Sequence, residues 1–398
     1  MFVSIPEERL NDVVKIQKTP EGMDPREKIV SALDTPLGTD RLGDIGKPGK
    51  TVALAIQYAH AADILAPLTQ RIVETLEISG VKDEDVAQII SGDIYSPHAG
   101  EVTAGISPRK ITHSFVKSAM LPTNSFLLGS PAQIDKNFKE ADIKISVGVV
   151  EPQYLTGYTG APHTVAPGLL DVGVIQNLYK DAFRRDYKDS FPLQEVSEEI
   201  LRLCNLAEVN FTVNVIVDKG EVTDVVAGEP EKAFTEATKR YEERYRCEVK
   251  NPVDAVIAGA GGAPFDSEIT GLYQGIENSL KVLEKGGQLV IAADCEKWIQ
   301  SKPLLTSLLN QKEDLASLRH RRIEDLLEFP HVFLLVKANE YADISLVATM
   351  PHYYTKRALK FRAYRTVNQA FQSALNRVEK NAKILAVQDT YHTILTMA

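Results

Sequence analysis

The sequence has few cysteine, tryptophan and methionine residues: three, one and five respectively in a chain of 398. The cysteines, Cys204, Cys247 and Cys295, are far apart and odd in number, so they do not form the disulfide framework of a small secreted protein. Acidic residues follow the N-terminus too early for a signal peptide, and no apolar run reaches the roughly 20 residues of a membrane span. We therefore expect reduced thiols, no membrane association and a cytoplasmic protein.

The sequence also has no dense run of lysine and arginine. Its formal net charge is −9 and its pI is near 5.5, which speaks against a surface for nucleic acid or anionic lipid. With 44% hydrophobic and 25% charged residues the composition is that of a folded globular protein. A chain of 398 residues exceeds the usual size of one hydrophobic core, which predicts two domains.

Alternating strand and helix patterns predict an α/β fold with largely parallel sheets flanked by helices. "KTVALAIQYAH" is typical of a strand, "ADILAPLTQRIVETLEISG" of a helix that ends at Gly80, and "EDVAQIISGD" of a second strand. "SFLLGS" then predicts a strand, "PAQIDKNFKEA" a helix and "DIKISVGVV" a buried strand. "NFTVNVIVDKGEVTDVVAGEP" alternates apolar and polar residues around "DKGE", as in a β-hairpin.

A charged helix, "EKAFTEATKRYEERYRCEV", leads to a hinge at "KNPVD". We therefore predict an N-terminal domain over residues 1–250 and a C-terminal α/β domain over 251–380, with 380–398 as a segment that could return to the first domain. The second domain opens with another strand, helix and strand. "PHVFLLVKA" and "ISLVATM" are interpreted as strand and connection, "TKRALKFRAY" to "RVEKNAKIL" as helical, and "KILAVQDT" as a last strand.

Three histidines follow predicted strands of the first domain: His60, His98 and His163. His163 lies in "GYTGAPHTVAPG", a loop rich in glycine and proline. Loops at the carboxyl edge of a parallel sheet can converge, so these imidazoles are candidates for acid–base catalysis or for a divalent metal such as nickel or zinc. The alternative is that each is a separate polar loop residue.

Two further motifs have a functional and a structural interpretation. "GAGGAPFD" from Gly259 follows a strand and precedes a helix, as in a dinucleotide site, but its spacing is not G-x-G-x-x-G. A tight strand-to-helix turn is the favoured interpretation. Cys295 follows a strand, where a nucleophile could lie, but no histidine is close in sequence, which favours a buried structural thiol.

Many segments, in order, resemble the lactate racemase family, the nickel-dependent enzymes that carry a nickel-pincer nucleotide. They include "GVVEPQYLTGYTGAPHTVAPGLLDVGVIQN", the hairpin, "AGGAPFDSEITGLYQGIENSLKVLEKGGQLVIAADC" and "AKILAVQDT". The resemblance implies two α/β domains with an active site in the cleft between them. It also implies hydride transfer that inverts a 2-hydroxy acid, with the cofactor joined to a lysine and nickel bound by histidine.

The functional residues of that family are replaced here. The Pro167-Gly168 pair sets the register, which puts His163 at the cofactor-bearing lysine, Gln153 at the first histidine and Tyr179 at the nickel histidine. An imidazole cannot form the amide linkage, so the resemblance speaks against a covalently held nickel-pincer nucleotide.

By the same resemblance, Tyr273 and Gln274 of a substrate-binding motif are retained. Glu277 replaces a lysine, which disfavours a carboxylate substrate such as lactate. The inherited frame of the cofactor loop then comprises Gly157, Gly160, Pro167 and Gly168, together with Gln153 and Tyr179.

Two functions follow from these residues. One is a divergent racemase or epimerase of a small hydroxylated substrate, which uses His163 with His98 or His60 as acid and base or as metal ligands. The other is a non-catalytic ligand-binding or scaffold descendant of the same fold. A different metal-assisted chemistry in the same cleft is a third alternative. In each case we expect a small-molecule ligand in the cleft, while the oligomeric state stays open.

Overall fold

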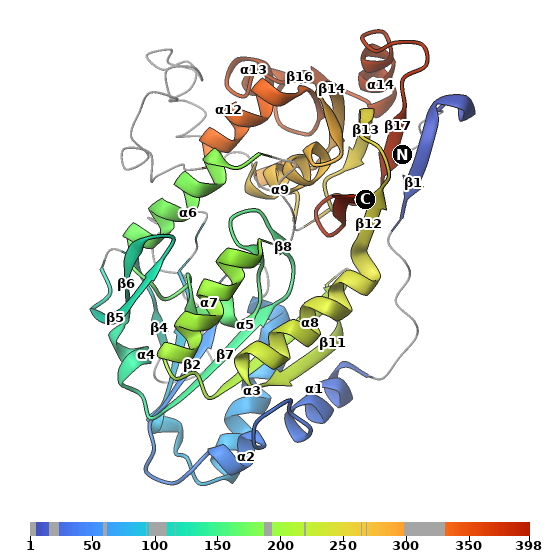
Figure 1. Ribbon diagram of the computed structural model, residues 1–398. Coiled ribbons are helices and arrows are strands. Elements are labelled where there is room, and N and C mark those ends of the chain that lie inside the picture. The colour runs from blue at the N-terminus through green and yellow to red at the C-terminus, as the bar shows by residue number, and fades with distance from the viewer. Residues whose placement is uncertain are drawn as a thin grey trace. The chain divides into compact units, whose positions relative to one another are not determined.

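The computed structural model describes residues 5–15, 24–58, 62–92, 94, 110–115, 117–186, 193–218, 220–263, 265–267, 269–297 and 331–398. These residues form a mixed α/β structure with mostly parallel sheets flanked by helices, as predicted (Figure 1). None of the described helices is long and apolar enough to cross a membrane.

The chain forms two compact units, each built from separate segments. The N-terminal unit comprises Lys18–Asp181 and Pro192–Glu243, and the C-terminal unit comprises Met1–Gln17, Ala182–Phe191 and Arg244–Ala398. The sequence predicted domains over residues 1–250 and 251–380, with 380–398 as a segment that could return to the first, whereas each of these units is built from two or three separate segments. Residues 1–17 belong with the C-terminal half of the chain.

The N-terminal unit is built on a six-stranded sheet in the order β11-β10-β7-β2-β3-β4. Its strands are β2 (Val52–Ile56), β3 (Val86–Ile90), β4 (Lys110–Thr112), β7 (Ile143–Val149), β10 (Phe211–Asp218) and β11 (Glu221–Gly228). All neighbours pair in parallel except β10 and β11, which form the predicted antiparallel hairpin. Helix α3 (Ala62–Ile78) joins β2 to β3, which confirms the predicted βαβ unit.

The core of this unit comes from apolar strand and helix faces. Leu54, Ile145 and Val213 on three neighbouring strands pack with Leu68 and Ile72 of α3. The other helices of the unit are α1 (Pro25–Asp34), α2 (Leu42–Ile45), α4 (Lys136–Glu140), α5 (Ala161–Val165), α6 (Val172–Arg184, which runs into the next unit), α7 (Gln194–Leu206) and α8 (Pro230–Tyr245, likewise).

One helix prediction in this unit is wrong in part. Residues 131–135 of "PAQIDKNFKEA" form β6 (Ser130–Asp135), which pairs antiparallel with β5 (Met120–Leu127); only α4 is helical. The turn between them has Leu128 and Gly129 at φ 49° and 75°, the two consecutive positive φ values of a tight hairpin turn. A leucine at positive φ gives little sequence signal, so the hairpin was missed.

The C-terminal unit has a parallel six-stranded sheet in the order β1-β17-β13-β14-β15-β16. Its strands are β1 (Leu10–Val14), β13 (Val253–Gly259), β14 (Leu283–Ala292), β15 (Asp343–Val347), β16 (Arg362–Tyr364) and β17 (Ile384–Val387). A separate pair joins β12 (Arg246–Val249) to β18 (Ile394–Met397). The chain end at 380–398 therefore lies in this unit. Its helices are α9 (Ile269–Leu280), α12 (His331–Tyr341), α13 (His352–Arg357) and α14 (Val367–Leu375).

Two expectations for this unit are corrected. "HVFLLVKA" is the helix α12 and not a strand, because a short apolar run has the same pattern in a buried helix and in a buried strand. The stretch predicted as helical after Met350 is interrupted by β16. Lys337 of α12 donates hydrogen bonds to the carbonyls of Ala182 and Arg185 at the end of α6, which explains why residues 182–191 belong to this unit.

Candidate functional site

The glycine- and proline-rich loop lies where the sequence predicted, after the carboxyl end of β7. Its short helix α5 packs on β2, β7 and β10 (Figure 1). A Cβ at Gly148 of β7 would lie 2.5 Å from the carbonyl of Gly160, so only glycine permits this approach. Asn214 of β10 then accepts the N–H of Ala161 through Oδ1 at 2.9 Å. The sheet thus holds the start of α5 by direct backbone contact.

His163 lies in α5 and is only 7% exposed. Neither Nδ1 nor Nε2 has a hydrogen-bond partner among the described residues, and the ring lies 5.3 Å from the Phe234 ring, centroid to centroid. Burial lowers the pKa of His163 to about 3. The imidazole is therefore neutral near pH 7, which is the form that binds a metal ion.

The other glycines and the proline of the loop serve backbone packing. Gly157 has φ 87°, and a Cβ there would lie 2.8 Å from the Leu193 nitrogen. Gly168, which follows Pro167, donates its N–H to the His163 carbonyl at 3.0 Å and accepts the N–H of Gly92 at 2.8 Å. These contacts fix the path of the loop.

Gln153 and Tyr179, which the resemblance places at histidines of the family, make hydrogen bonds within the protein. Gln153 is 1% exposed, and its Oε1 accepts the N–H groups of Leu155 and Thr156 and the hydroxyl of Thr156. The Tyr179 hydroxyl donates to the Ile94 carbonyl at 3.1 Å. The Gln153 oxygen and the Tyr179 hydroxyl are thus engaged by the protein, while Gln153 Nε2 has no hydrogen-bond partner among the described residues.

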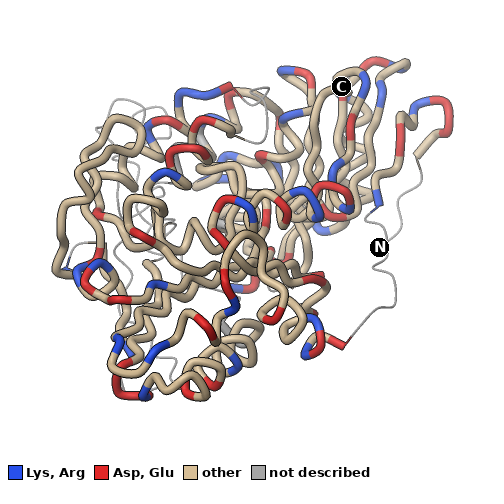
Figure 2. The backbone as a smooth tube through the Cα atoms, turned by 60° about the horizontal axis from the view of Figure 1, so that its bottom comes forward, with Lys and Arg blue, Asp and Glu red and all other residues tan. Residues whose placement is uncertain are grey.

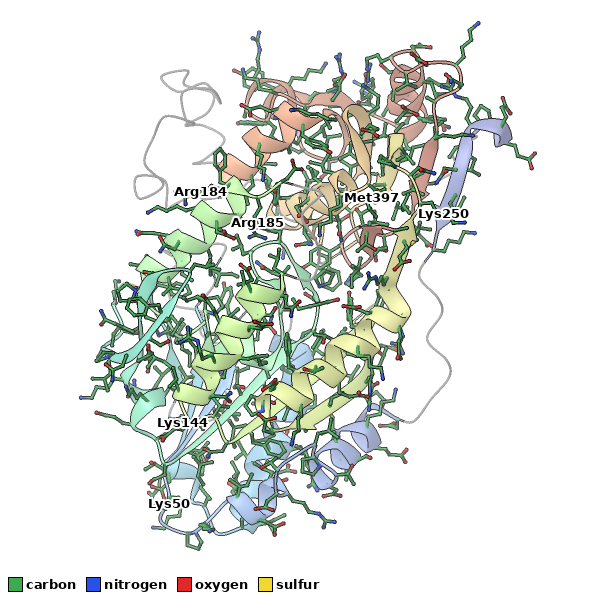
Figure 3. The ribbon with its side chains drawn as sticks, in the orientation of Figure 1. Lys50, Lys144, Arg184, Arg185, Lys250 and Met397 are labelled. Carbon is green, nitrogen blue, oxygen red and sulfur yellow. The ribbon has the colours of Figure 1, made fainter. Side chains whose placement is uncertain are left out.

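His60 and His98 lie outside the described residues, so their convergence with His163 stays a prediction. In the described part of the chain, no three His, Cys, Asp or Glu residues are arranged to hold a metal ion. Lys50 and Lys144 of this unit lie at the amino ends of β2 and β7, opposite the edge where the loop begins (Figure 3). The position that the resemblance assigns to the cofactor-bearing lysine holds the His163 imidazole, which cannot form the amide linkage.

The predicted substrate residues Tyr273, Gln274 and Glu277 lie on α9 in the C-terminal unit. Tyr273 and Gln274 are buried at 1% and 3% exposure. Glu277 forms an ion pair with Lys281, one helical turn later, at 3.2 Å. Because Lys281 compensates the negative charge of Glu277, this position repels a substrate carboxylate less than expected from Glu277 alone.

Sequence reasoning missed two Asp–His pairs, of which the first is buried and the second partly buried. His113 Nδ1 lies 2.9 Å from Asp135 and its Nε2 lies 3.0 Å from the Leu170 carbonyl. In the C-terminal unit, His392 Nδ1 lies 2.8 Å from Asp389 in the sequence "QDTYH", directly after β17. For the His392–Asp389 pair, the sequence signal was a histidine three residues after an aspartate at the end of a strand. The His113–Asp135 pair has no such signal, because its two residues are 22 positions apart in the sequence.

The free cysteines are Cys204 and Cys295, both buried, and Cys247, partly buried. Burial raises the pKa of Cys295 to about 12, so its thiol stays protonated and is a poor nucleophile. This supports its interpretation as a structural residue. Figure 2 shows acidic and basic residues interspersed along the described chain, in agreement with the absence of a basic run in the sequence.

Comparison with known proteins identifies relatives of this chain. Residues 1–188 match the family model of the lactate racemase N-terminal domain. The lactate racemase of Thermoanaerobacterium thermosaccharolyticum is 23% identical over 309 residues, which cover 73% of this chain and 71% of that protein. The lactate racemase of Lactiplantibacillus plantarum is 21% identical over 285 residues, which cover 67% of this chain and 66% of that protein.

The lactate racemase of T. thermosaccharolyticum is also similar to this chain in its fold. The lactate racemase apoprotein from T. thermosaccharolyticum superposes with a TM-score of 0.84 at 20% identity, covering 99% of this chain and 96% of that one. A protein from Thermotoga maritima superposes with a TM-score of 0.64 at 14% identity, covering 96% of this chain and 100% of that one. Together, these matches show that residues 1–188 carry a lactate racemase N-terminal domain and that the chain as a whole has the fold of the lactate racemase apoprotein.

Proposed function

We propose that this protein interconverts stereoisomers of a small hydroxylated compound without a covalently attached cofactor. The observation that carries the proposal is His163. It is a buried, neutral imidazole in the loop that the resemblance assigns to cofactor attachment, and neither of its nitrogens has a partner in the part of the chain that the structure describes. Leaving a buried polar group without a partner costs about 1–3 kcal/mol. A bound metal ion or ligand at this position would offset that cost.

The chemistry of His163 favours metal ligation over acid–base catalysis. A base with a pKa of about 3 takes up a proton weakly at neutral pH. A neutral imidazole, in contrast, binds nickel or zinc through its lone pair, and the metal can polarise a substrate hydroxyl. His60 and His98 are the proposed further ligands. The ligand is a small molecule, and no covalent nickel-pincer nucleotide is required.

The test is metal analysis and intact mass of the purified protein and of His163→Ala. We expect one divalent metal per chain in the parent, loss of that metal in the variant, and the unmodified sequence mass in both. His352→Ala, which removes an imidazole of the C-terminal unit, is the control and should keep the metal. Equal metal content in parent and His163→Ala would refute a metal site at His163, and a mass adduct would refute the non-covalent proposal.

A second candidate is a non-catalytic ligand-binding or scaffold protein. It is favoured by Gln153 and Tyr179, whose polar ends hydrogen bond to the protein. This alternative predicts a metal-free, unmodified protein that binds small hydroxylated compounds without changing their optical rotation. Polarimetry with the purified protein separates the two functions.

A further inference from the structure

The C-terminal unit has a topological switch point at β13 and β17. Chain order runs from β13 to β14, β15 and β16 on one side, and then returns to β17 on the other side of β13 (Figure 1). All these pairs are parallel. In open parallel sheets, ligands bind beyond the carboxyl ends of the strands at such a point.

The two turns that leave these strand ends are in direct contact. Thr390 donates its N–H to the Gly259 carbonyl at 2.8 Å. A Cβ at Gly261 would lie 2.6 Å from the Tyr391 Cβ, so the turn after β13 must be glycine to accommodate the turn after β17. The Phe265 ring lies edge-on to the His392 ring, with 4.4 Å between centroids. The turn after β13 and the turn after β17 therefore pack directly against each other.

Asp266, next to Phe265, carries an unexplained polar atom. The residue is 5% exposed, and its Oδ2 accepts the N–H of Asp294, after β14, at 3.1 Å. Its Oδ1 has no hydrogen-bond partner among the described residues. Burial raises the pKa of this carboxyl by more than the hydrogen bond from the Asp294 N–H lowers it, and the charge of Asp294 raises it as well. A buried carboxyl oxygen without a partner costs free energy, so the fold alone does not account for it.

The opposite side of this structure is held rigid by Asp389. Its Oδ1 accepts the N–H groups of Tyr391 and His392, and its Oδ2 holds His392 Nδ1 at 2.8 Å. Burial raises the pKa of Asp389, but the hydrogen bonds from His392 and the backbone outweigh it and the net pKa is lowered. The imidazole therefore has a fixed ring orientation at the strand edge.

From this juxtaposition we infer a ligand site at the carboxyl ends of β13, β14 and β17, in which Asp266 Oδ1 hydrogen bonds to a hydroxyl group of a small neutral molecule. His392, oriented by Asp389 and packed on Phe265, is the aromatic and polar side of this site. This inference takes only the class of ligand, a small hydroxylated compound, from the proposed function. It requires neither a metal nor His163.

The charges at this edge select a neutral ligand. Among the described residues at this edge, the acidic groups are Asp266, Asp294, Glu296 and Asp389, and the lysine is Lys297, whose backbone N–H bonds to the Ser267 carbonyl. The His392 Nδ1 faces Asp389. This excess of carboxylates disfavours a carboxylate or phosphate ligand. Carboxyl oxygens are good acceptors for hydroxyl groups.

The test is binding of D-ribose and dihydroxyacetone to the full-length protein by calorimetry, with D-lactate as the charged comparison. We expect both neutral compounds to bind more tightly than D-lactate. Asp266→Asn should weaken their binding about tenfold, the size of one lost hydrogen bond to a charged group. Since asparagine keeps an oxygen for the Asp294 N–H, the variant should fold, as its circular dichroism and melting temperature will show.

The control is Glu379→Gln, an equal change of charge at an exposed position before β17, which should leave binding unchanged. Unchanged binding by Asp266→Asn, tighter binding of D-lactate, or no binding of either neutral compound to the parent overturns the inference. His163→Ala separates the two proposals. If His163→Ala loses its metal but still binds ribose, both proposals stand. If the parent protein contains no metal but loses ribose binding in Asp266→Asn, the metal site at His163 is refuted and the ligand site at Asp266 stands.

Discussion

The buried His113–Asp135 pair is a strong determinant of stability at the residue scale. The two ring nitrogens of His113 lie within hydrogen-bond distance of the Asp135 carboxylate and the Leu170 carbonyl. Both side chains are fully buried. The pair connects the end of β4 to the cap of α4 and to the segment after Gly168.

We expect Asp135→Asn to lower the free energy of unfolding by about 1–3 kcal/mol, because it removes the charged partner of a buried hydrogen bond. Urea unfolding at pH 7 measures the loss. The double variant His113→Leu/Asp135→Asn is the matched control and should recover part of it, since the buried imidazole that lost its partner is also removed. A loss below about 0.5 kcal/mol in Asp135→Asn would show that this hydrogen bond contributes little to stability.

The same carboxyl predicts a pH dependence. Burial raises the pKa of Asp135, but hydrogen bonds from His113 and from the backbone of Phe138 and Asn137 outweigh it, so the net pKa lies below its usual 3.8. A lowered folded-state pKa contributes stability above pH 3.8 that is lost as the pH falls below it. The stability difference between parent and Asp135→Asn should therefore shrink between pH 5 and about pH 2 in urea titrations. A difference that grows on acidification would contradict this assignment.

At the scale of elements, α5 depends on a glycine in the neighbouring strand. A Cβ at Gly148 would lie 2.5 Å from the carbonyl carbon and oxygen of Gly160 and 2.8 Å from the Ala161 nitrogen. We expect Gly148→Ala to displace α5 and to destabilise the protein by about 1–3 kcal/mol. Gly43→Ala is the control, because its Cβ would meet the nearest atom at an ordinary 3.5 Å. Equal melting temperatures for the two variants would contradict the close approach.

Sequence pattern predicted most elements where the pattern has one physical interpretation. Period-two alternation around "DKGE" predicted the β10–β11 hairpin, and the apolar runs of β2, β3 and β7 predicted buried parallel strands. It was wrong for α12, where a short apolar run fits helix and strand equally, and for β6, whose turn has an atypical leucine. The candidate site was predicted at the level of its loop, because glycine and proline signal backbone constraints directly.

The side-chain chemistry of the site was less predictable, because it depends on contacts between distant segments. That Gln153 and Tyr179 make internal hydrogen bonds, and that Lys281 compensates Glu277, requires the folded structure. The positions of His60 and His98 relative to His163 stay predictions. The Asp266 oxygen without a partner had no sequence signal, since a buried and an exposed aspartate look the same in a sequence.

At the scale of the whole molecule, the chain builds its C-terminal unit from both ends. Strand β1 pairs in parallel with β17 at one edge of the sheet, with Val13 opposite Ala386 and Val14 opposite Val387. Arg9 also bonds to the Glu379 carbonyl. Local patterns could not predict this, because a five-residue strand at the N-terminus carries no information about its partner some 370 residues later.

Removal of residues 1–14 should therefore destabilise the C-terminal unit and not the N-terminal unit. The truncation removes Val14, which is 8% exposed, and a fully buried valine contributes about 1.5–3 kcal/mol. It also leaves β17 as an edge strand, whose amides then open to solvent. Hydrogen exchange followed by mass spectrometry should show faster exchange for Ile384–Val387, while Ile143–Val149 of β7 exchanges as in the parent. Faster exchange in both strands would mean that the two units unfold together, and unchanged exchange in both would mean that β1 contributes nothing to the stability of this sheet.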